Sequence, residues 1–120
     1  MNILIVDSSA AMRMMIIRTL RQAGFGGHDI EQASDGVEAL DSIRRVACDL
    51  VLADWNMPNM TGLELLRALR HEGNQVTFGF ITTDATPPMR AKAEEAGAKF
   101  MISKPITVDT FEKTLGGIIN

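Results

Sequence analysis

Short apolar runs alternate along this chain with segments of helical periodicity, and this alternation constrains the fold more than any other feature. Nearly continuous apolar runs of strand length are typical of strands buried on both faces. Strands that alternate with helices form a parallel sheet covered on both sides, because each helix returns the chain to the start of the next strand. The strand candidates are Asn2–Val6, Asp29–Ala33 (the weakest), Leu50–Ala53, Phe78–Thr82 and Phe100–Ser103.

The first helix candidate begins after Ser9, a good N-cap residue, and ends at Gly24. Its expected apolar stripe is Met12, Met15, Ile16, Leu20 and Ala23. Met14 and Ile17 fall outside this stripe, so they either pack on the last helix or form an exposed partner patch. The other helix candidates carry Val37, Leu40 and Ile43; Leu63, Leu66 and Leu69; the segment from Pro88 to Gly97; and Val108, Phe111 and Leu115.

Length and charge narrow the class of protein. The 120 residues suit one domain, 1–120, so we expect no output domain on this chain. A net charge of −3 argues against nucleic acid or an anionic membrane as a partner. We also expect a monomer. One cysteine excludes an internal disulfide, and no apolar run is long enough for a signal peptide or membrane span. We therefore expect a cytoplasmic protein.

Polar residues follow four of the predicted strands directly. Asp7-Ser8, Asp54, Thr82-Thr83 and Lys104-Pro105 stand at these positions. Ligands of doubly wound sheets bind at the carboxyl ends of the strands, so these side chains should converge. The two carboxylates could hold Mg²⁺, and one of them could accept a phosphoryl group, with the ammonium supplying positive charge and the hydroxyl a hydrogen bond. Alternatively, these residues could form a structural ion-pair cluster. The residues alone leave both alternatives open.

Several longer motifs carry a family resemblance. These are ILIVD from Ile3, ASDGVEAL from Ala33, DWNMPNMTGLELL from Asp54, ITTDA from Ile81 and SKP from Ser103. On these motifs the chain resembles the receiver domains of response regulators, and among them the stand-alone, CheY-like chemotaxis type. The resemblance covers essentially the whole chain. It implies a flavodoxin-like α/β fold with a doubly wound five-stranded parallel sheet in the order 2-1-3-4-5.

The resemblance also implies a function. Asp54 would accept a phosphoryl group from a phosphohistidine of a sensor histidine kinase, with Mg²⁺ held by Asp7, Asp54 and the backbone carbonyl of Asn56. Thr82 and Lys104 would contact the phosphoryl group, and the Lys104–Pro105 bond would be cis. Gly36 would serve the turn into the second helix, and Pro58 and Gly62 would shape the loop after Asp54. Such a protein assists only its own phosphorylation and dephosphorylation, so it is not an enzyme acting on other substrates.

Three positions modulate this expectation. Ser8 stands where the family has a second acid, which weakens the metal site or marks a receiver fold that binds partners without phosphorylation. Met101 stands where related receivers carry a switching aromatic residue, so it either keeps that coupling with a softer rotamer preference or only packs at the edge of the core. Asn56 and Asp84, each two residues beyond a site residue, are expected to flank the water that hydrolyses the phosphoryl group.

The family also implies a partner surface on the fourth helix, fifth strand and fifth helix. This surface corresponds to Met89–Ala96, Lys99–Ser103 and Val108–Leu115. The protein could regulate a flagellar motor component through it, or could instead serve as a phosphate sink.

An enzyme of another class is disfavoured, because the segment after the first strand, DSSAAMR, lacks the glycines of a phosphate-binding loop.

Overall fold

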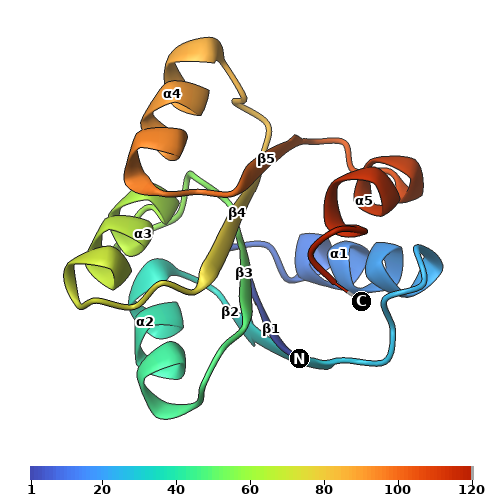
Figure 1. The fold of residues 1–120 in the computed structure, drawn as a ribbon, viewed down its shortest axis with the longest axis horizontal. Helices are drawn as coiled ribbons and strands as arrows, with labels where there is room; N and C mark the ends of the chain where they lie inside the picture. The colour runs from blue at the N-terminus through green and yellow to red at the C-terminus, as the bar shows by residue number, and fades with distance from the viewer. Residues whose placement is uncertain (120) are drawn as a thin grey trace.

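The computed structural model describes residues 1–119, and in it five parallel strands and five helices alternate along the chain (Figure 1). The sheet order is β2-β1-β3-β4-β5, as predicted. The elements are β1 (Asn2–Val6), α1 (Ala10–Gln22), β2 (Asp29–Ala33), α2 (Gly36–Arg45), β3 (Leu50–Ala53), α3 (Gly62–His71), β4 (Thr77–Thr82), α4 (Pro87–Ala96), β5 (Phe100–Ser103) and α5 (Val108–Leu115).

The sheet separates two hydrophobic cores. Successive side chains of a strand point to opposite faces, so Ile3 and Ile5 of β1 enter one core while Leu4 and Val6 enter the other. Figure 1 shows α1 and α5 on the first face and α2, α3 and α4 on the second. Because β1, β3 and β4 are buried on both faces, their sequences read as continuous apolar runs.

Each helix begins at a residue whose side chain accepts a hydrogen bond from a backbone N–H of the first turn. The five N-caps are Ser9, Asp35, Thr61, Thr86 and Thr107. Thr61 and Glu64 form a reciprocal capping box at the start of α3. Each cap fixes the residue at which its helix begins, and so sets the length of the loop that connects the preceding strand to that helix. The polar side chains of these loops are thereby held near the strand ends.

The predicted stripe of α1 is wrong at Met15, while for Ile17 the alternative of packing on the last helix is confirmed. Met15, expected in the core, is 49% exposed, whereas Ile17, expected outside the stripe, is only 5% exposed. Ile17 packs in the same core as Phe111 and Leu115 of α5, because α5 lies beside α1 and widens the buried face of that helix. Met14 is exposed, so packing on the last helix accounts for only one of the two residues in question.

Other differences are smaller. Val37 of α2, predicted to be buried, is exposed. Strand β4 begins at Thr77, α4 begins at Pro87, and α1 ends at Gln22, each within two residues of the predicted bound. Asn120 lies outside the described residues.

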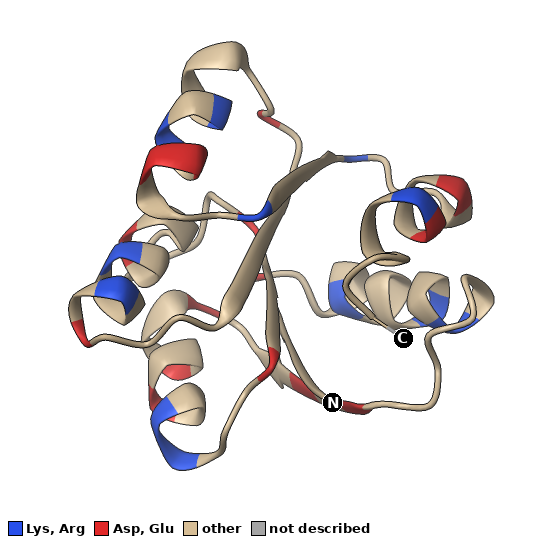
Figure 2. Ribbon diagram, in the orientation of Figure 1, with Lys and Arg blue, Asp and Glu red and all other residues tan. Residues whose placement is uncertain are grey.

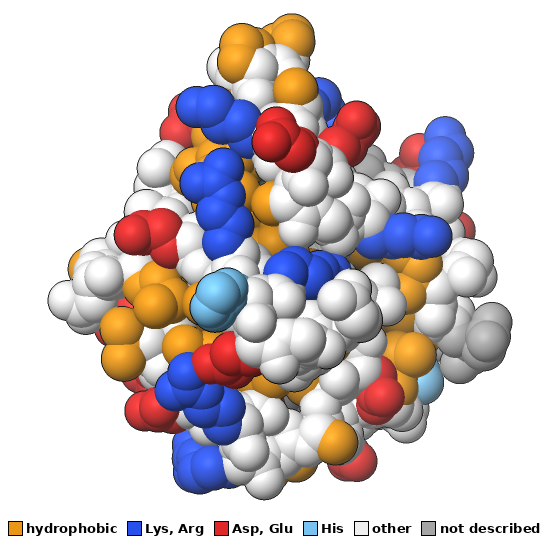
Figure 3. All heavy atoms as spheres, turned by 60° about the vertical axis from the view of Figure 1, so that its left-hand side comes forward, with side chains coloured by type: hydrophobic (Ala, Val, Ile, Leu, Met, Phe, Trp, Pro, Cys, Tyr) orange, Lys and Arg blue, Asp and Glu red, His pale blue; other side chains and the backbone are white. Residues whose placement is uncertain are grey.

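Charged residues lie mainly on the helices, while the middle of the sheet is largely uncharged (Figure 2). On the side formed by α2, α3 and α4, basic and acidic side chains are interspersed with apolar atoms (Figure 3). An Arg44–Glu72 ion pair joins α2 to α3 there. Within residues 1–119, no helix combines the length and the apolar character needed to cross a bilayer.

Candidate functional site

Three of the predicted site residues meet at the carboxyl end of the sheet. The Lys104 ammonium, just beyond β5, lies 2.9 Å from Asp7 Oδ2 and 3.3 Å from Asp54 Oδ2. Asp7 and Asp54 come directly after β1 and β3, which are neighbours in the sheet. Parallel neighbouring strands end on the same edge, and this is why residues far apart in sequence converge here.

The ammonium of Lys104 is largely buried, with a side chain that is 10% exposed. Burial alone would lower its pKa, since a charged group is poorly solvated there. The hydrogen bond to Asp7 and the negative charges of Asp54 and Asp7 outweigh this effect, so the pKa of Lys104 lies above its ordinary value. Lys104 is therefore a cation that balances both carboxylates.

Asp54 is the most accessible member of this group, with a side chain that is 14% exposed. Its Oδ1 accepts a hydrogen bond of 2.7 Å from the backbone N–H of Trp55, and its Oδ2 accepts from Lys104. The indole of Trp55 stacks at a tilt on Phe80, with 4.9 Å between ring centroids. The indole thus belongs to the residue that follows Asp54, and it packs on the core.

Thr82, at the end of β4, is completely buried. Its hydroxyl accepts a hydrogen bond of 3.3 Å from the N–H of Asp84. Beyond it, Asn56 Nδ2 donates to Asp84 Oδ2 at 2.7 Å, so the loops that follow β3 and β4 are joined by these two side chains. Both are exposed, and this bond was not foreseen from the sequence.

Two glycines allow the loop after Asp54 to pack closely. A Cβ on Gly62 would lie 2.1 Å from the Asp54 carbonyl oxygen and 2.9 Å from the Phe80 ring, so only glycine fits. Gly36 has a related role: a Cβ there would lie 2.7 Å from the side chain of Met60. Gly36 was expected at the turn into the second helix, and in the structure it is the first residue of α2, where it also makes room for Met60 of the β3–α3 loop.

Sequence reasoning missed Arg13, which lies in the first turn of α1. Its Nη1 donates to the Asp7 carbonyl at 2.7 Å and its Nε donates to Gln32 Oε1 at 3.0 Å. The only signal in the sequence was a basic residue four positions after the N-cap, which is too common to be informative.

Comparison with known proteins identifies the family of this chain. Residues 3–115 match the response regulator receiver domain. The chain belongs to the receiver family. It is 36% identical over 120 residues to the chemotaxis protein CheY-3 of Vibrio cholerae, a match that covers 98% of this chain and 91% of CheY-3.

The receiver also resembles a solved structure and part of a longer protein. The structure of the Vibrio cholerae chemotaxis protein CheY4 superposes with a TM-score of 0.86 at 32% identity, with 98% of both chains covered. The sensor protein EvgS of Escherichia coli is 34% identical over 115 residues, but this chain spans only 9% of the length of EvgS. The chain is therefore a CheY-like receiver with a flavodoxin-like fold.

This receiver differs from the expected family pattern at Ser8 and Met101. Ser8 is exposed at the mouth of the site, directly after Asp7. Met101 is half-buried, pairs in register with Phe80 of β4, and packs against the core that is covered by α2, α3 and α4. The neighbouring Phe100 packs in the opposite core. The Lys104–Pro105 peptide bond is cis, as the resemblance implied.

The side chains of the receiver suit a small, hard cation. Residues 1–119 contain no cluster of three or more His, Cys, Asp or Glu residues that could hold a metal. The carboxylates of Asp7 and Asp54 nevertheless converge on one cationic centre, the ammonium of Lys104. Mg²⁺ takes one or two carboxylates and keeps several waters, so two aspartates and a backbone carbonyl form an adequate donor set.

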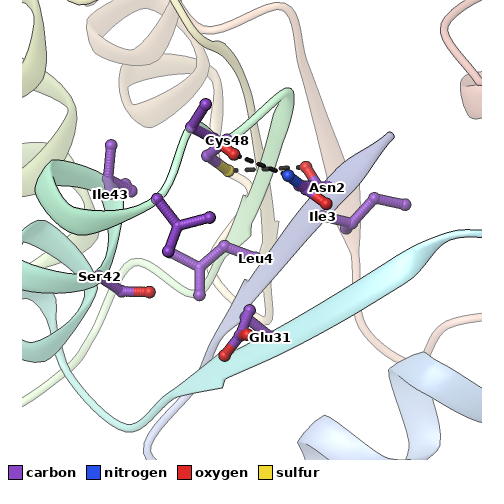
Figure 4. A pocket seen from close by; sticks show the side chains of 9 residues that line it. Asn2, Ile3, Leu4, Glu31, Ser42, Ile43 and Cys48 are labelled. Atoms are coloured by element: carbon purple, nitrogen blue, oxygen red, sulfur yellow. Dashed lines mark hydrogen bonds between the residues drawn. The ribbon is translucent and has the colours of Figure 1, made fainter.

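The receiver also has a small cavity at the opposite, amino-terminal end of the strands (Figure 4). Its volume is about 20 Å³, and Leu4, Ile43 and Cys48 are among the residues that line it. The Cys48 thiol donates to the carbonyl of Leu50 at 3.3 Å. Burial raises the pKa of this thiol, and the cavity is too small for more than a water molecule.

Proposed function

We propose that this receiver accepts a phosphoryl group on Asp54 and responds by changing its affinity for a partner protein. The observation that most supports this proposal is the contact of one largely buried ammonium, Lys104, with both Asp7 and Asp54. In a purely structural ion-pair cluster both carboxylates could be buried, whereas here Asp54 is more exposed than Asp7.

The donor in this proposal is a phosphohistidine of a sensor histidine kinase. A carboxylate oxygen of Asp54 attacks phosphorus, the new O–P bond forms as the N–P bond breaks, and the imidazole leaves with the electron pair and takes up a proton. Phosphoryl transfer depends mostly on positioning and on positive charge near the phosphoryl oxygens. Lys104 supplies that charge from just beyond β5, and the Thr82 hydroxyl, whose oxygen accepts from the Asp84 N–H, donates its own proton to a phosphoryl oxygen.

Asp7, Asp54 and the backbone carbonyl of Asn56 are the residues that would hold Mg²⁺. When bound, the ion adds positive charge beside the transferred group. Asp7 is suited to this role because it is 2% exposed and its Oδ1 accepts from the N–H of Ser9, so its carboxylate is held in one orientation. Ser8 adds no charge, so we propose a metal site that is weakened but retained.

The partner surface in this proposal is the face formed by α4, β5 and α5. A groove of about 270 Å³ lies there, and Arg90, Phe100, Met101 and Thr114 contribute to its lining. Phosphorylation would shift the balance between two conformations of this face. Resemblance to the chemotaxis proteins CheY-3 and CheY4 supports a chemotaxis target, such as a flagellar motor component. We further propose that this receiver domain acts in the cytoplasm as a monomer.

A phosphorylation-independent binding module is the second candidate, and the exposed Ser8 is the observation in its favour. Mass spectrometry separates the two functions. Incubation with acetyl phosphate and Mg²⁺ should add one phosphoryl group to the intact protein, and Asp54→Asn should abolish the addition because the nucleophile is lost. Asp109→Asn, at an exposed acid on α5, is the matched control and should still be modified. An unmodified wild-type protein at every donor concentration would favour the binding module.

A further inference from the structure

Arg13 makes two side-chain hydrogen bonds that join α1 to the carboxyl ends of β1 and β2. Its guanidinium is half-buried, and it bonds the Asp7 carbonyl at the end of β1 and the Gln32 side chain on β2. The backbone N–H of Arg13 donates to the carbonyl of Ser9, so its own position is set by the first turn of α1. One side chain therefore bridges a helix and two strands.

Asp7 is held at four points. Its N–H donates to the Ala33 carbonyl at 3.1 Å, Oδ1 accepts from the Ser9 N–H at 2.9 Å, and Oδ2 accepts from Lys104 at 2.9 Å. The fourth point is its carbonyl, which Arg13 holds. The peptide between Asp7 and Ser8 is where the chain leaves the sheet, and the Arg13 bond fixes the orientation of that peptide.

We infer that Arg13 is a positioning residue, which holds the Asp7–Ser8 peptide so that the Asp7 carboxylate faces Asp54. This inference rests on the function proposed above. Ser8 contributes no carboxylate, so all the negative charge at the end of β1 belongs to Asp7. An error in the placement of Asp7 therefore has no second acid to offset it.

The fork of the guanidinium is essential to this role. Arginine can donate to the Asp7 carbonyl and to Gln32 at the same time, whereas lysine offers a single point of attachment. The positive charge alone acts in the opposite direction, because it repels a divalent cation. Arg13→Lys keeps the charge and loses the fork, so it separates the two effects.

The test uses the full chain and has a readout with Mg²⁺ and one without it. A Mg²⁺ titration followed by Trp55 fluorescence should show Arg13→Lys binding roughly threefold to tenfold more weakly than wild type, a loss of about 0.6 to 1.4 kcal/mol. Arg18→Lys, at an exposed position of the same helix, is the control and should bind as wild type does. In the metal-free protein, the Ser9 N–H should exchange with solvent faster in Arg13→Lys, because its acceptor Asp7 Oδ1 is less well held.

Two results would overturn the inference. The first is Mg²⁺ affinity and Ser9 exchange in Arg13→Lys equal to those of wild type. The second is weaker Mg²⁺ binding in Arg13→Lys with an unchanged rate of Ser9 N–H exchange, since a residue that acts by holding Asp7 must also affect the Ser9 N–H bonded to Asp7 Oδ1. If wild-type protein neither binds Mg²⁺ nor accepts a phosphoryl group, the proposed function fails, and Ser9 exchange still reports whether Arg13 orders Asp7.

Discussion

At the residue scale, the site is a balance between two carboxylates and one ammonium. Removing one member of such a buried group leaves an uncompensated charge, which typically costs about 3 to 5 kcal/mol. This is why Asp7, although 2% exposed, is tolerated at the end of an apolar strand: Lys104 and the Ser9 N–H satisfy its two oxygens. A ligand that enters the site must replace these contacts.

Ser8→Asp should tighten Mg²⁺ binding roughly tenfold, or about 1 to 2 kcal/mol, because it adds a carboxylate at the solvated mouth of the site. The extra negative charge should also lower the free energy of unfolding of the metal-free protein. A Mg²⁺ titration followed by Trp55 fluorescence measures the affinity. Ser8→Asn, which adds similar volume without charge, is the control, and Asp7→Ala should nearly eliminate binding. Unchanged affinity in Ser8→Asp would mean that Ser8 does not occupy a ligand position.

Asp84→Ala should lengthen the lifetime of the phosphorylated protein by roughly threefold to tenfold, below the hundredfold that a full general base contributes. The reason is that Asp84, which accepts a hydrogen bond of 2.7 Å from Asn56, would orient the attacking water in the proposed mechanism. Phosphoryl decay followed by intact mass gives the rate. Asp84→Asn keeps an acceptor for Asn56 and should give an intermediate lifetime. A lifetime in Asp84→Ala equal to or shorter than that of wild type would contradict this role.

At the scale of elements, the helices differ in how firmly they are anchored. Five residues of α3 are buried, whereas Ala93 is the one buried residue of α4. Elements with few buried apolar contacts open at low free-energy cost, and switching elements are drawn from them. The loose packing of α4 therefore suits the partner surface proposed for it.

Helix α1 offers a direct test of the two packing assignments. Ile17→Ala should lower the free energy of unfolding by about 2 to 4 kcal/mol, because it removes methyl groups from the core between α1 and α5. Met15→Ala, in the same helix and with the same final residue, should change it by less than about 0.5 kcal/mol. Urea denaturation measures both values. Similar losses for the two variants would contradict the observed orientation of α1.

At the scale of the whole molecule, the two ends of the sheet have different characters. The carboxyl end carries the charged site, and the amino end carries the small cavity beside Cys48. The two apolar layers between them tie both ends to one sheet.

The stability of the whole protein should fall at alkaline pH partly through Cys48. Burial raises the pKa of its thiol in the folded state. The unfolded thiol ionises first, near pH 8.5, so the unfolded state binds fewer protons and stability decreases as pH rises further. Denaturant midpoints measured from about pH 7 to about pH 10 should decline less steeply for Cys48→Ala than for wild type. Parallel curves for the two proteins would contradict this contribution.

The sequence by itself determined the order of the elements, the parallel sheet and the four positions at the strand ends. These follow from local rules: apolar runs, cap residues such as Ser9, and the convergence of parallel strands on one edge. The motifs around Asp54 and Lys104 pointed to the receiver family, which the comparisons confirmed. The roles of Asp7, Asp54, Asn56, Thr82 and Lys104 remain predictions.

Only the tertiary structure decided which side chains meet. Ile17 is buried because α5 lies against α1. The periodicity of one helix cannot reveal that it packs on a second helix more than 90 residues later in the chain. Gly36 is needed because Met60 approaches it, and Arg13 became significant only when its guanidinium was found on Asp7 and Gln32. Each of these contacts joins segments distant in sequence, and their geometry depends on the packing of the entire fold.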